Sequence, residues 1–486
     1  MRWAPLLLLA ACQGSFDESI CPFRLHASQV QGESVRCGIL RTAEFHDAPA
    51  RYIDVPVVVF KGTSARATPV FTLNGGPGQS WADLGLDSIT RQASQQSGGD
   101  RVFIEQRGTG IANPRLACGV QNDGETDEAY VRRCNAAWAA RAVDVSAFNT
   151  RELAGDVDTL RQALGYEKIV LIGVSYGTGW AQEVLRRYGE HLHAVVLDSV
   201  VSPQSPPLGE TAIAIDEAFT ALFQACAADA TCKTRFGGLE AKMLETLALL
   251  TATPLEVKGK EPFTAEVFFS AAMALLSAEP KVAPRFIDEL HTAAKSGSLR
   301  LSDTFAALLE SNDAATSSLA FGQYMSVACS DNQFVDRAKI DADAARLRPA
   351  FLPHVGDAGH ILALCDLWSF RRRPAEDFAI VASSVPVLLF AGALDPRTPP
   401  RWAMEVGLGL TKAQLVVVPH AGHNVLGSGL DCVAEAMDEF SRTLKLAGKP
   451  CDGIPFVVDA PSRAVQPLRL RQHVSAPELM RLLRDF

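Results

Sequence analysis

Five short runs of apolar, mostly branched residues punctuate the first 200 residues of the chain. Their length and composition predict strands at residues 52–60, 69–73, 101–105, 169–172 and 194–197. Residues 150–164 instead place leucine and valine on one stripe at helical spacing, with Thr150 as the expected N-cap and Gly165 as the stop. This helix leads directly into the strand at 169–172, which predicts a βαβ unit and therefore a parallel sheet.

Helical periodicity replaces the strand pattern from about residue 204 to 384. Helices are expected at residues 213–226, 239–250, 265–276 and 286–294. The proline cluster Pro203, Pro206 and Pro207 marks the boundary. Strand patterns return at 385–391 and 415–418, before a last helix at 432–446. The middle region is therefore interpreted as an inserted cap rather than a separate C-terminal domain.

These patterns predict an α/β fold with a mostly parallel central sheet, flanking helices and an inserted helical cap. The expected segments are a signal peptide at 1–11, the first part of the sheet domain at 12–203, the cap at 204–384, and the second part with a C-terminal extension at 385–486. Residues 13–50 are expected to be irregular. A loop is expected between Cys118 and Cys134.

Composition narrows the class of protein. The chain has 486 residues, of which 48% are hydrophobic and 21% charged, as in ordinary soluble domains. Its net charge is −9, and its longest basic run, residues 371–373, is expected to be a solvated face, so we expect no nucleic-acid partner. No Cys-x-x-Cys or Cys-x-x-His spacing indicates a metal site, and no cofactor is expected. The oligomeric state stays open.

The N-terminus has one positive charge, a short apolar run and then Leu9-Ala10-Ala11-Cys12. The run is too short for a spanning helix, which needs about 20 residues, and it fits an export signal. The last four residues resemble the bacterial lipobox, in which the cysteine is lipidated. We therefore expect a protein of the bacterial cell envelope, anchored by lipid at Cys12. The alternative is ordinary cleavage nearby, which leaves a soluble periplasmic or extracellular protein.

Ten cysteines remain after Cys12, an even number that falls into neighbouring couples. This arrangement predicts five local disulfides formed in an oxidising compartment. The expected pairs are Cys21–Cys37, Cys118–Cys134, Cys226–Cys232, Cys329–Cys365 and Cys432–Cys451. The alternative is ten reduced, buried thiols in a cytosolic enzyme.

The turn Gly-Val-Ser-Tyr-Gly at 173–177 lies between the strand at 169–172 and a helical pattern through Trp180 and Leu185. Strand, Gly-x-Ser-x-Gly turn and helix together are the pattern of a nucleophile elbow. The turn exposes the Ser175 hydroxyl at the edge of the sheet, where the helix start points N–H groups at an oxyanion. A structural glycine turn with an incidental serine is the alternative.

A second glycine-rich turn, Asn-Gly-Gly-Pro-Gly at 74–78, follows the strand at 69–73. Its backbone can approach a ligand closely. The N–H groups of Gly75 and Gly76, with that of Tyr176 behind the nucleophile, are the expected oxyanion hole. The alternative is a Gly-Pro turn that binds nothing.

A serine nucleophile needs a general base and an acid that orients this base. In chains with this elbow the order is Ser, Asp, His, with each partner on a loop after a strand. Asp395 and His423 each follow one of the last two strands. We therefore assign Ser175 as nucleophile, His423 as base and Asp395 as orienting acid. His420 is the alternative base, and Asp198, at the end of an earlier strand, is the alternative acid.

Together these motifs resemble the secreted α/β-hydrolase peptidases of the prolyl aminopeptidase and tripeptidyl aminopeptidase group (TAP-like). The resemblance spans the whole exported part of the chain. It rests on Gly75–Gly78, Gln106–Gly110, Gly173–Thr178, Gly392–Pro399, Gly422–His423 and the tail between Cys432 and Cys451.

The resemblance implies an α/β-hydrolase fold and an enzyme that removes residues or short peptides from free N-termini. Members of the group bind the substrate amine with acidic groups from the cap, and Asp331 is the candidate here. A solvated or helix-capping aspartate is the alternative. The chain departs from the group at Asn74, where histidine is usual, and at Glu105, where aspartate is usual. The first departure leaves the fine substrate preference open.

The leading hypothesis is therefore an exported serine aminopeptidase that acts on peptides. An esterase or small-molecule acyl hydrolase on the same scaffold is the second. The third is a non-catalytic envelope binding protein, which predicts that Ser175, His423 and Asp395 do not converge.

Overall fold

The structure is a computed structural model that describes most of the chain. The described residues are 14–81, 98–205, 207–257, 261–298, 319–356 and 358–458. The expected signal peptide and Cys12 lie outside them, as do residues 459–486 of the expected C-terminal extension.

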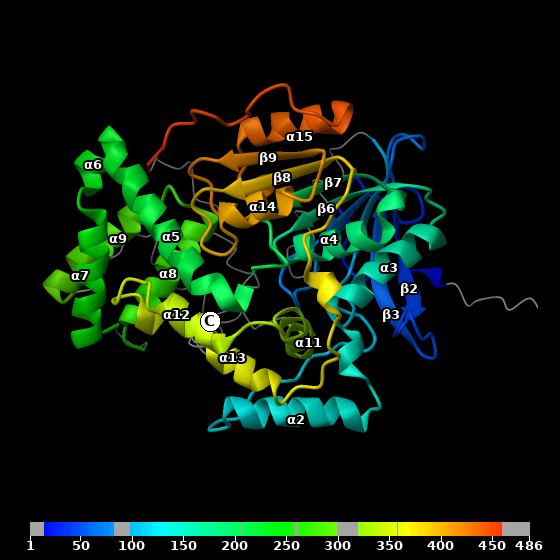
Figure 1. Ribbon diagram of the computed structural model, residues 1–486, viewed down its shortest axis with the longest axis horizontal. Helices are drawn as coiled ribbons and strands as arrows, with labels where there is room; N and C mark the ends of the chain where they lie inside the picture. The colour runs from blue at the N-terminus through cyan, green and yellow to red at the C-terminus, as the bar shows by residue number, and fades with distance from the viewer. Residues whose placement is uncertain are drawn as a thin grey trace, which may run out of the picture.

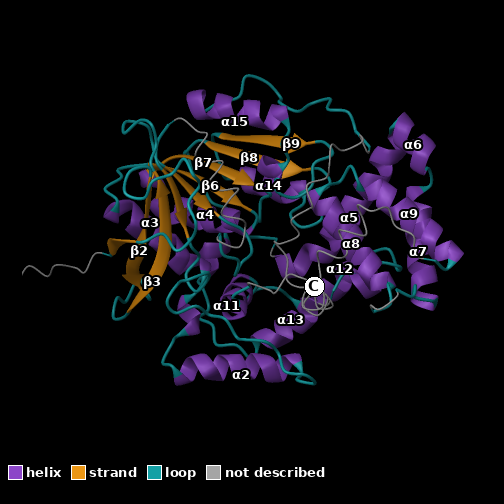
Figure 2. Cartoon of the chain, turned by 180° about the vertical axis from the view of Figure 1, so that it is seen from behind, coloured by secondary structure: helices purple, strands orange, loops and turns teal. Residues whose placement is uncertain are grey.

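Among the described residues, a nine-stranded sheet forms the centre of the molecule (Figure 1, Figure 2). Its strands are β1 Ser15–Ser19, β2 Val35–Ala43, β3 Tyr52–Phe60, β4 Val70–Leu73, β5 Arg101–Ile104, β6 Ile169–Val174, β7 Leu192–Asp198, β8 Val387–Gly392 and β9 Ala413–Val418. Their order in space is β1-β2-β3-β5-β4-β6-β7-β8-β9. β1, β2, β3 and β5 pair antiparallel, and all pairs from β5 and β4 to β8 and β9 are parallel. The sheet is therefore mostly parallel, and its parallel strands end at one edge.

Helices cover both faces of the sheet, because successive strand residues point to opposite sides. On β7, Val195 belongs to the core that α3, α4 and α14 cover, whereas Val196 belongs to the core beneath α15. The bounds of these helices are α3 Thr150–Ala163, α4 Tyr176–Tyr188, α14 Pro400–Gly407 and α15 Asp431–Thr443. Short 3₁₀ turns follow several elements, at η1 Val145–Ala147, η2 Gly189–His191, η3 Leu352–His354, η4 Ala375–Phe378 and η5 Val425–Gly427.

Between β7 and β8 the described residues form helices, with isolated bridges at Leu255–Phe263 and Ser383–Leu410. The helices are α5 Pro207–Ala228, α6 Ala230–Phe236, α7 Leu239–Ala252, α8 Ala265–Ala278, α9 Ala283–Ser296, α11 Phe321–Asp331, α12 Arg337–Ala344 and α13 Ala358–Cys365. In Figure 1, α5 to α9 form an outer bundle at the left, and α11 and α13 lie below the sheet.

This helical region has two cores. The outer bundle packs around its own apolar cluster, which includes Phe219 and Phe268. α11 and α13 instead join the main core beside the sheet, through Met325 and Ile361. By length and composition alone, α5 is the one described helix that could cross a membrane, and a single such helix is weak support for a membrane protein.

The structure contains all five predicted disulfides. They are Cys21–Cys37, Cys118–Cys134, Cys226–Cys232, Cys329–Cys365 and Cys432–Cys451. Their Cα atoms lie 5.0 to 5.3 Å apart, within the usual range for a disulfide. The bridge between Cys329 and Cys365 links α11 to α13.

Residues 13–50 are not irregular as predicted, because they contain β1 and β2. β2 pairs along its whole length with β3. Its apolar pattern is interrupted by Arg36, Gly38 and Arg41, and this interruption hides the strand in the sequence.

Two other local predictions are also wrong. The loop expected between Cys118 and Cys134 includes the start of a helix, α2 Asp127–Ala140, whose few buried positions are surrounded by polar residues. The N-cap of α3 is Asn149 rather than Thr150: the Asn149 side chain accepts hydrogen bonds from the first N–H groups of the helix. Thr150 is thereby free to make contacts in the pocket described below.

Candidate active site

Three parallel strands bring the predicted catalytic residues to one edge of the sheet. β6 ends directly before Ser175, and β8 and β9 end shortly before Asp395 and His423. Because β6, β7, β8 and β9 are parallel neighbours, their carboxyl ends lie side by side.

Ser175 adopts a backbone conformation that few side chains tolerate. Its φ of 57° and ψ of −127° lie outside the regions favoured by L-residues, and they turn β6 directly into α4. Its hydroxyl does not cap α4 and lines a pocket instead. The turn needs a glycine at position 177, because a Cβ there would lie 2.2 Å from the carbonyl oxygen of Leu73. The sharp turn therefore leaves the Ser175 side chain available at the pocket.

Asp395 is a buried carboxylate surrounded by donors. Its Oδ1 accepts the N–H groups of Arg397 at 2.8 Å and Thr398 at 3.0 Å. Its Oδ2 accepts the Thr398 hydroxyl at 2.7 Å and lies 2.8 Å from His423 Nδ1. Burial alone would raise the pKa of Asp395, but the charge of His423 and these hydrogen bonds outweigh it, so the pKa lies below its usual range. The carboxylate is therefore ionised and orients the imidazole.

The cap holds the backbone of His423 in place. The His423 N–H donates to the carbonyl oxygen of Ser277 in α8 at 2.7 Å, and the next N–H, of Asn424, donates to the Ser199 hydroxyl at 2.8 Å. Among the described residues, no hydrogen bond joins the Ser175 hydroxyl to His423. Such hydrogen bonds often tighten only in the complex with substrate. The structure thus brings Asp395 and His423 into contact and places Ser175 at the end of β6, which β7 separates from β8.

The two alternative residues have other positions. The His420 ring packs 4.8 Å from the ring of Phe456, and burial lowers its pKa. The Asp198 carboxylate accepts the N–H groups of Val425 at 3.0 Å and Leu426 at 2.8 Å. Burial raises the pKa of Asp198 to about 6, although these hydrogen bonds act in the opposite direction. Asp198 therefore holds the loop that follows His423 rather than the imidazole itself.

The glycine-rich loop at 74–78 lies against Ser175. A Cβ at Gly75 would lie 3.0 Å from the Ser175 Cβ, and Gly76 lines the pocket together with Tyr176. Gln106 fixes this loop: its Nε2 donates to the Gly75 carbonyl at 2.7 Å, and its Oε1 accepts the N–H of Gly78 at 3.0 Å. The loop is therefore held where the second oxyanion donor is expected.

The two departures from the family pattern lie behind this loop. The Asn74 Nδ2 donates to the carbonyl of Gln79 at 2.7 Å, while its buried Oδ1 accepts no hydrogen bond from the described residues. Glu105 accepts the hydroxyls of Ser80 and Thr109. Neither Asn74 nor Glu105 is among the residues that line the pocket.

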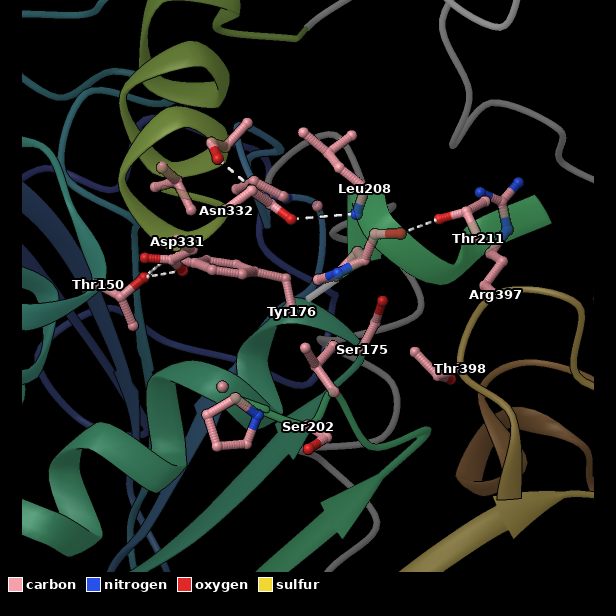
Figure 3. A pocket seen from close by; sticks show the side chains of 18 of the residues that line it. Thr150, Ser175, Tyr176, Ser202, Leu208, Thr211, Asp331, Asn332, Arg397 and Thr398 are labelled. Carbon is pink, nitrogen blue, oxygen red and sulfur yellow. Dashed lines mark hydrogen bonds between the residues drawn. The ribbon is translucent and has the colours of Figure 1, made fainter. Parts of the chain in front are cut away.

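The pocket extends to both sides of Ser175 (Figure 3). On one side lie Thr150, Tyr176 and Asp331, and on the other lie Arg397 and Thr398. The outer bundle contributes apolar side chains such as Met273 from α8. The described residues contain no group of three or more His, Cys, Asp or Glu side chains placed to hold a metal ion.

Asp331 lines the pocket, but its carboxylate already has partners. Its Oδ1 lies 2.6 Å from Arg373 Nη1, and its Oδ2 accepts the Thr150 hydroxyl at 2.6 Å. The buried Arg373 also pairs with Glu183 at 3.2 Å and Asp377 at 3.3 Å. Burial alone would lower the pKa of Arg373, but the carboxylates of Asp331, Glu183 and Asp377 raise it above its usual range.

Arg186 and Arg187 supply two further cations at Glu183, with N–O distances of 3.3 and 2.5 Å. This end of the pocket is therefore close to charge balance. The prediction that the basic run 371–373 is a solvated face is wrong for its last residue: Arg371 and Arg372 are exposed, but Arg373 is buried.

Four residues with a clear place in this arrangement were missed or given no role from the sequence. Thr398 and Gln106 were visible within the recognised motifs, where a hydroxyl three residues after Asp395 and an amide after β5 were the available signals. Ser277 and Arg373 gave no local signal, because their contacts depend on how the cap packs.

Comparisons with known proteins agree with this arrangement. Residues 68–262 match the family described as "alpha/beta hydrolase fold", and residues 354–451 match the family described as "TAP-like protein". The serine protease Hip1 of Mycobacterium tuberculosis (strain ATCC 25618 / H37Rv) is 23% identical over 451 residues, which cover 82% of this chain and 83% of that protein. The tripeptidyl aminopeptidase of Streptomyces lividans is 25% identical over 328 residues, which cover 64% of this chain and 59% of that protein.

Solved structures of esterases are also similar. A thermophilic esterase from Thermogutta terrifontis is 16% identical with a TM-score of 0.37, covering 84% of this chain and 99% of that one. An esterase from Exiguobacterium antarcticum is 12% identical with a TM-score of 0.34, covering 81% and 97%. The two family matches, together with the sheet order and the elbow, show an α/β-hydrolase fold, in which residues 354–451 are similar to the TAP-like family.

Proposed function

We propose that this hydrolase is an exported serine aminopeptidase that removes residues or short peptides from free N-termini. One observation carries the proposal: the hydrogen-bonded pair of Asp395 and His423 lies at the strand ends beside a pocket that Ser175 lines. The serine protease and the tripeptidyl aminopeptidase named above favour a peptide substrate.

In the proposed reaction, the Ser175 Oγ attacks the carbonyl carbon of the substrate while His423 Nε2 takes the hydroxyl proton. Asp395 holds Nδ1–H and stabilises the imidazolium that forms. The N–H groups of Gly76 and Tyr176 bind the oxyanion of the tetrahedral intermediate. His423 then protonates the leaving amine, the C–N bond breaks, and water hydrolyses the acyl-enzyme by the reverse sequence of proton transfers.

Export is part of the proposal. Five disulfides support an oxidising compartment, because the cytosol keeps most thiols reduced. The signal peptide at 1–11 and lipidation at Cys12 remain predictions from the sequence. Mass spectrometry of the N-terminal peptide from membrane fractions tests them, and an unmodified Cys12 behind an intact leader contradicts both.

One observation favours the esterase as a second candidate. An aminopeptidase needs a carboxylate for the protonated amine, yet Asp331 is already held by Arg373 and Thr150. In the peptidase, the substrate amine must take over part of this coordination. An ester substrate makes no such demand.

A panel of substrates separates the two candidates. The panel contains chromogenic aminoacyl, dipeptidyl and tripeptidyl amides, their N-acetylated forms and short-chain esters. We expect turnover of amides with a free amine, and a loss of at least about 10⁴-fold in kcat for Ser175→Ala, since removal of a serine nucleophile has this effect in related mechanisms. The control is Ser441→Ala at an exposed position of α15. Ester turnover without amide turnover selects the esterase, and activity that survives in Ser175→Ala rejects the mechanism.

A further inference from the structure

Arg397 brings a positive charge into the pocket that no described carboxylate neutralises. Its side chain is half-buried and lines the pocket with Ser175 and Thr398 (Figure 3). Its Nε donates to the Ser277 hydroxyl at 3.3 Å. Among the described residues, no aspartate or glutamate oxygen lies within ion-pair distance of its guanidinium.

The neighbouring Asp395 does not fill this role. Asp395 accepts the backbone N–H of Arg397, while its second oxygen is used by Thr398 and His423. Burial lowers the pKa of Arg397, and the charge of Asp395 acts weakly in the opposite direction. A guanidinium nevertheless stays protonated in proteins. A partly desolvated cation without a partner is costly, so an anionic ligand here would be stabilised.

Arg397 lies on the same side of Ser175 as the general base. Ser277 contacts both residues: its hydroxyl accepts from Arg397 Nε, and its carbonyl accepts the N–H of His423. The preceding residue, Gly422, packs so closely on α8 that a Cβ there would lie 2.2 Å from the Ser277 carbonyl oxygen. In Figure 3, Ser175 lies between Asp331 on one side and Arg397 on the other.

The chemistry of the reaction then identifies which part of a substrate meets Arg397. The base that takes the serine proton later delivers it to the leaving amine, so the leaving fragment lies on the side of His423. The acyl fragment, with its free N-terminus, lies on the opposite side, towards Asp331.

We propose that Arg397 binds a carboxylate of the leaving fragment and thereby makes the enzyme selective for peptides with a negative charge just after the cleaved bond. The proposal rests on the proposed peptidase function. The carboxylate has two possible sources: the free C-terminus of a short peptide, or the side chain of an aspartate or glutamate. A planar guanidinium suits both, because it can donate two parallel hydrogen bonds to one carboxylate.

The test uses three peptides that share one acyl fragment, chosen from the amides that the enzyme hydrolyses. Their leaving fragments are alanine with a free carboxylate, alanine amide, and glutamic acid with an amidated C-terminus. For the unsubstituted enzyme we expect kcat/KM to be about 10- to 100-fold higher for at least one carboxylate-bearing peptide than for the alanine amide. The free alanine identifies C-terminal recognition, and the glutamyl amide identifies side-chain recognition.

Substitution of Arg397 provides the decisive comparison. In Arg397→Gln, kcat/KM for the carboxylate-bearing peptides should fall to about that for the alanine amide, so that their ratio is about 1. Arg397→Lys keeps the charge and should restore part of this ratio. Arg372→Gln, which removes an exposed arginine that does not line the pocket, should leave the ratio unchanged. If Arg397→Gln does not fold, the inference is tested by the kcat/KM ratios of the unsubstituted enzyme and of Arg397→Lys.

Failure of this inference is distinguishable from failure of the proposed function. Hydrolysis of free-amine amides without any preference for a carboxylate contradicts the role of Arg397 but agrees with the proposed aminopeptidase function. A Ser175→Ala protein gives a readout without turnover: dissociation constants of the same three peptides should show the same ratio. Equal affinities there overturn the inference whichever bond the active enzyme cleaves.

Discussion

Each side of the pocket contains an arginine, but carboxylates of the described residues pair with only one of the two. On the side of Asp331, the Arg373 guanidinium contacts three carboxylates, those of Asp331, Glu183 and Asp377. On the side of His423, Arg397 contacts only a hydroxyl through its side chain, among the described residues. Both arginines line the same pocket. The difference teaches that a charged residue in a pocket indicates a ligand only when its charge is not already compensated by the protein.

The comparison also explains why the candidate amine site is less clear than the catalytic pair. Asp331 was a candidate because of the resemblance to the family, yet its carboxylate stabilises Arg373. A substrate amine has to compete with a guanidinium there, whereas a substrate carboxylate meets no competitor at Arg397.

Asp395 holds the imidazole of His423. Among the substitutions that test the comparison between the two sides, that of Asp395 should have the largest effect. In Asp395→Asn the amide can no longer stabilise the imidazolium, and it favours the wrong tautomer of His423. We expect kcat to fall by about 10³- to 10⁴-fold with little change in the fold. Steady-state kinetics on the best chromogenic amide measure this loss. A fall below tenfold contradicts the role of Asp395 as the acid that orients His423.

The matched pair Arg373→Met and Arg397→Met tests the comparison itself. Arg373→Met removes the cation that pairs with Asp331, whereas Arg186 and Arg187 remain beside the other two carboxylates. Because it breaks a buried ion-pair network, we expect a loss of about 3–5 kcal/mol in the free energy of unfolding. Arg397→Met removes a cation that has no carboxylate partner, so we expect a change within about 1 kcal/mol, or a gain. Urea denaturation at neutral pH measures both. Equal losses of stability in the two variants contradict the conclusion that the charge of Arg373 is compensated by carboxylates and that of Arg397 is not.

Asp198 extends the comparison to a buried carboxylate without a cation among the described residues. Its pKa in the folded protein is raised to about 6 from 3.8, so the folded state binds the proton more tightly than the unfolded state. The resulting stability is present below about pH 4 and is lost as the pH rises through about 6. Relative to Asp198→Asn, the free energy of unfolding should therefore fall by about 2 kcal/mol between pH 4 and pH 7.

The measurement is a series of urea denaturation curves for the two proteins at matched pH values. The difference between the proteins removes the contributions of all other titrating groups. A difference that is constant over this range, or that changes in the opposite direction, contradicts the raised pKa.

The sequence predicted the features that depend on local pattern. The elbow at Ser175, the parallel strands and the five disulfides all follow from spacing within a few tens of residues. β2 was missed, because Arg36 and Arg41 face partly or fully outward on a strand near the edge of the sheet and break its apolar run. The roles of Arg373 and Ser277 could not be predicted, because their partners come from other elements: Asp331 is 42 positions from Arg373, and Ser277 reaches His423 only through the docking of α8.

The contact between Ser277 and His423 has a consequence for the evolution and engineering of this enzyme. Because the last turn of α8 holds the backbone of His423, the proposed general base, the inserted region is not an independent module that can be exchanged for that of a relative. A transplanted insertion has to reproduce this one carbonyl at the same position, or the chimera loses turnover together with its old selectivity. New specificity is therefore more accessible through substitutions elsewhere in the outer bundle than through replacement of the bundle as a whole.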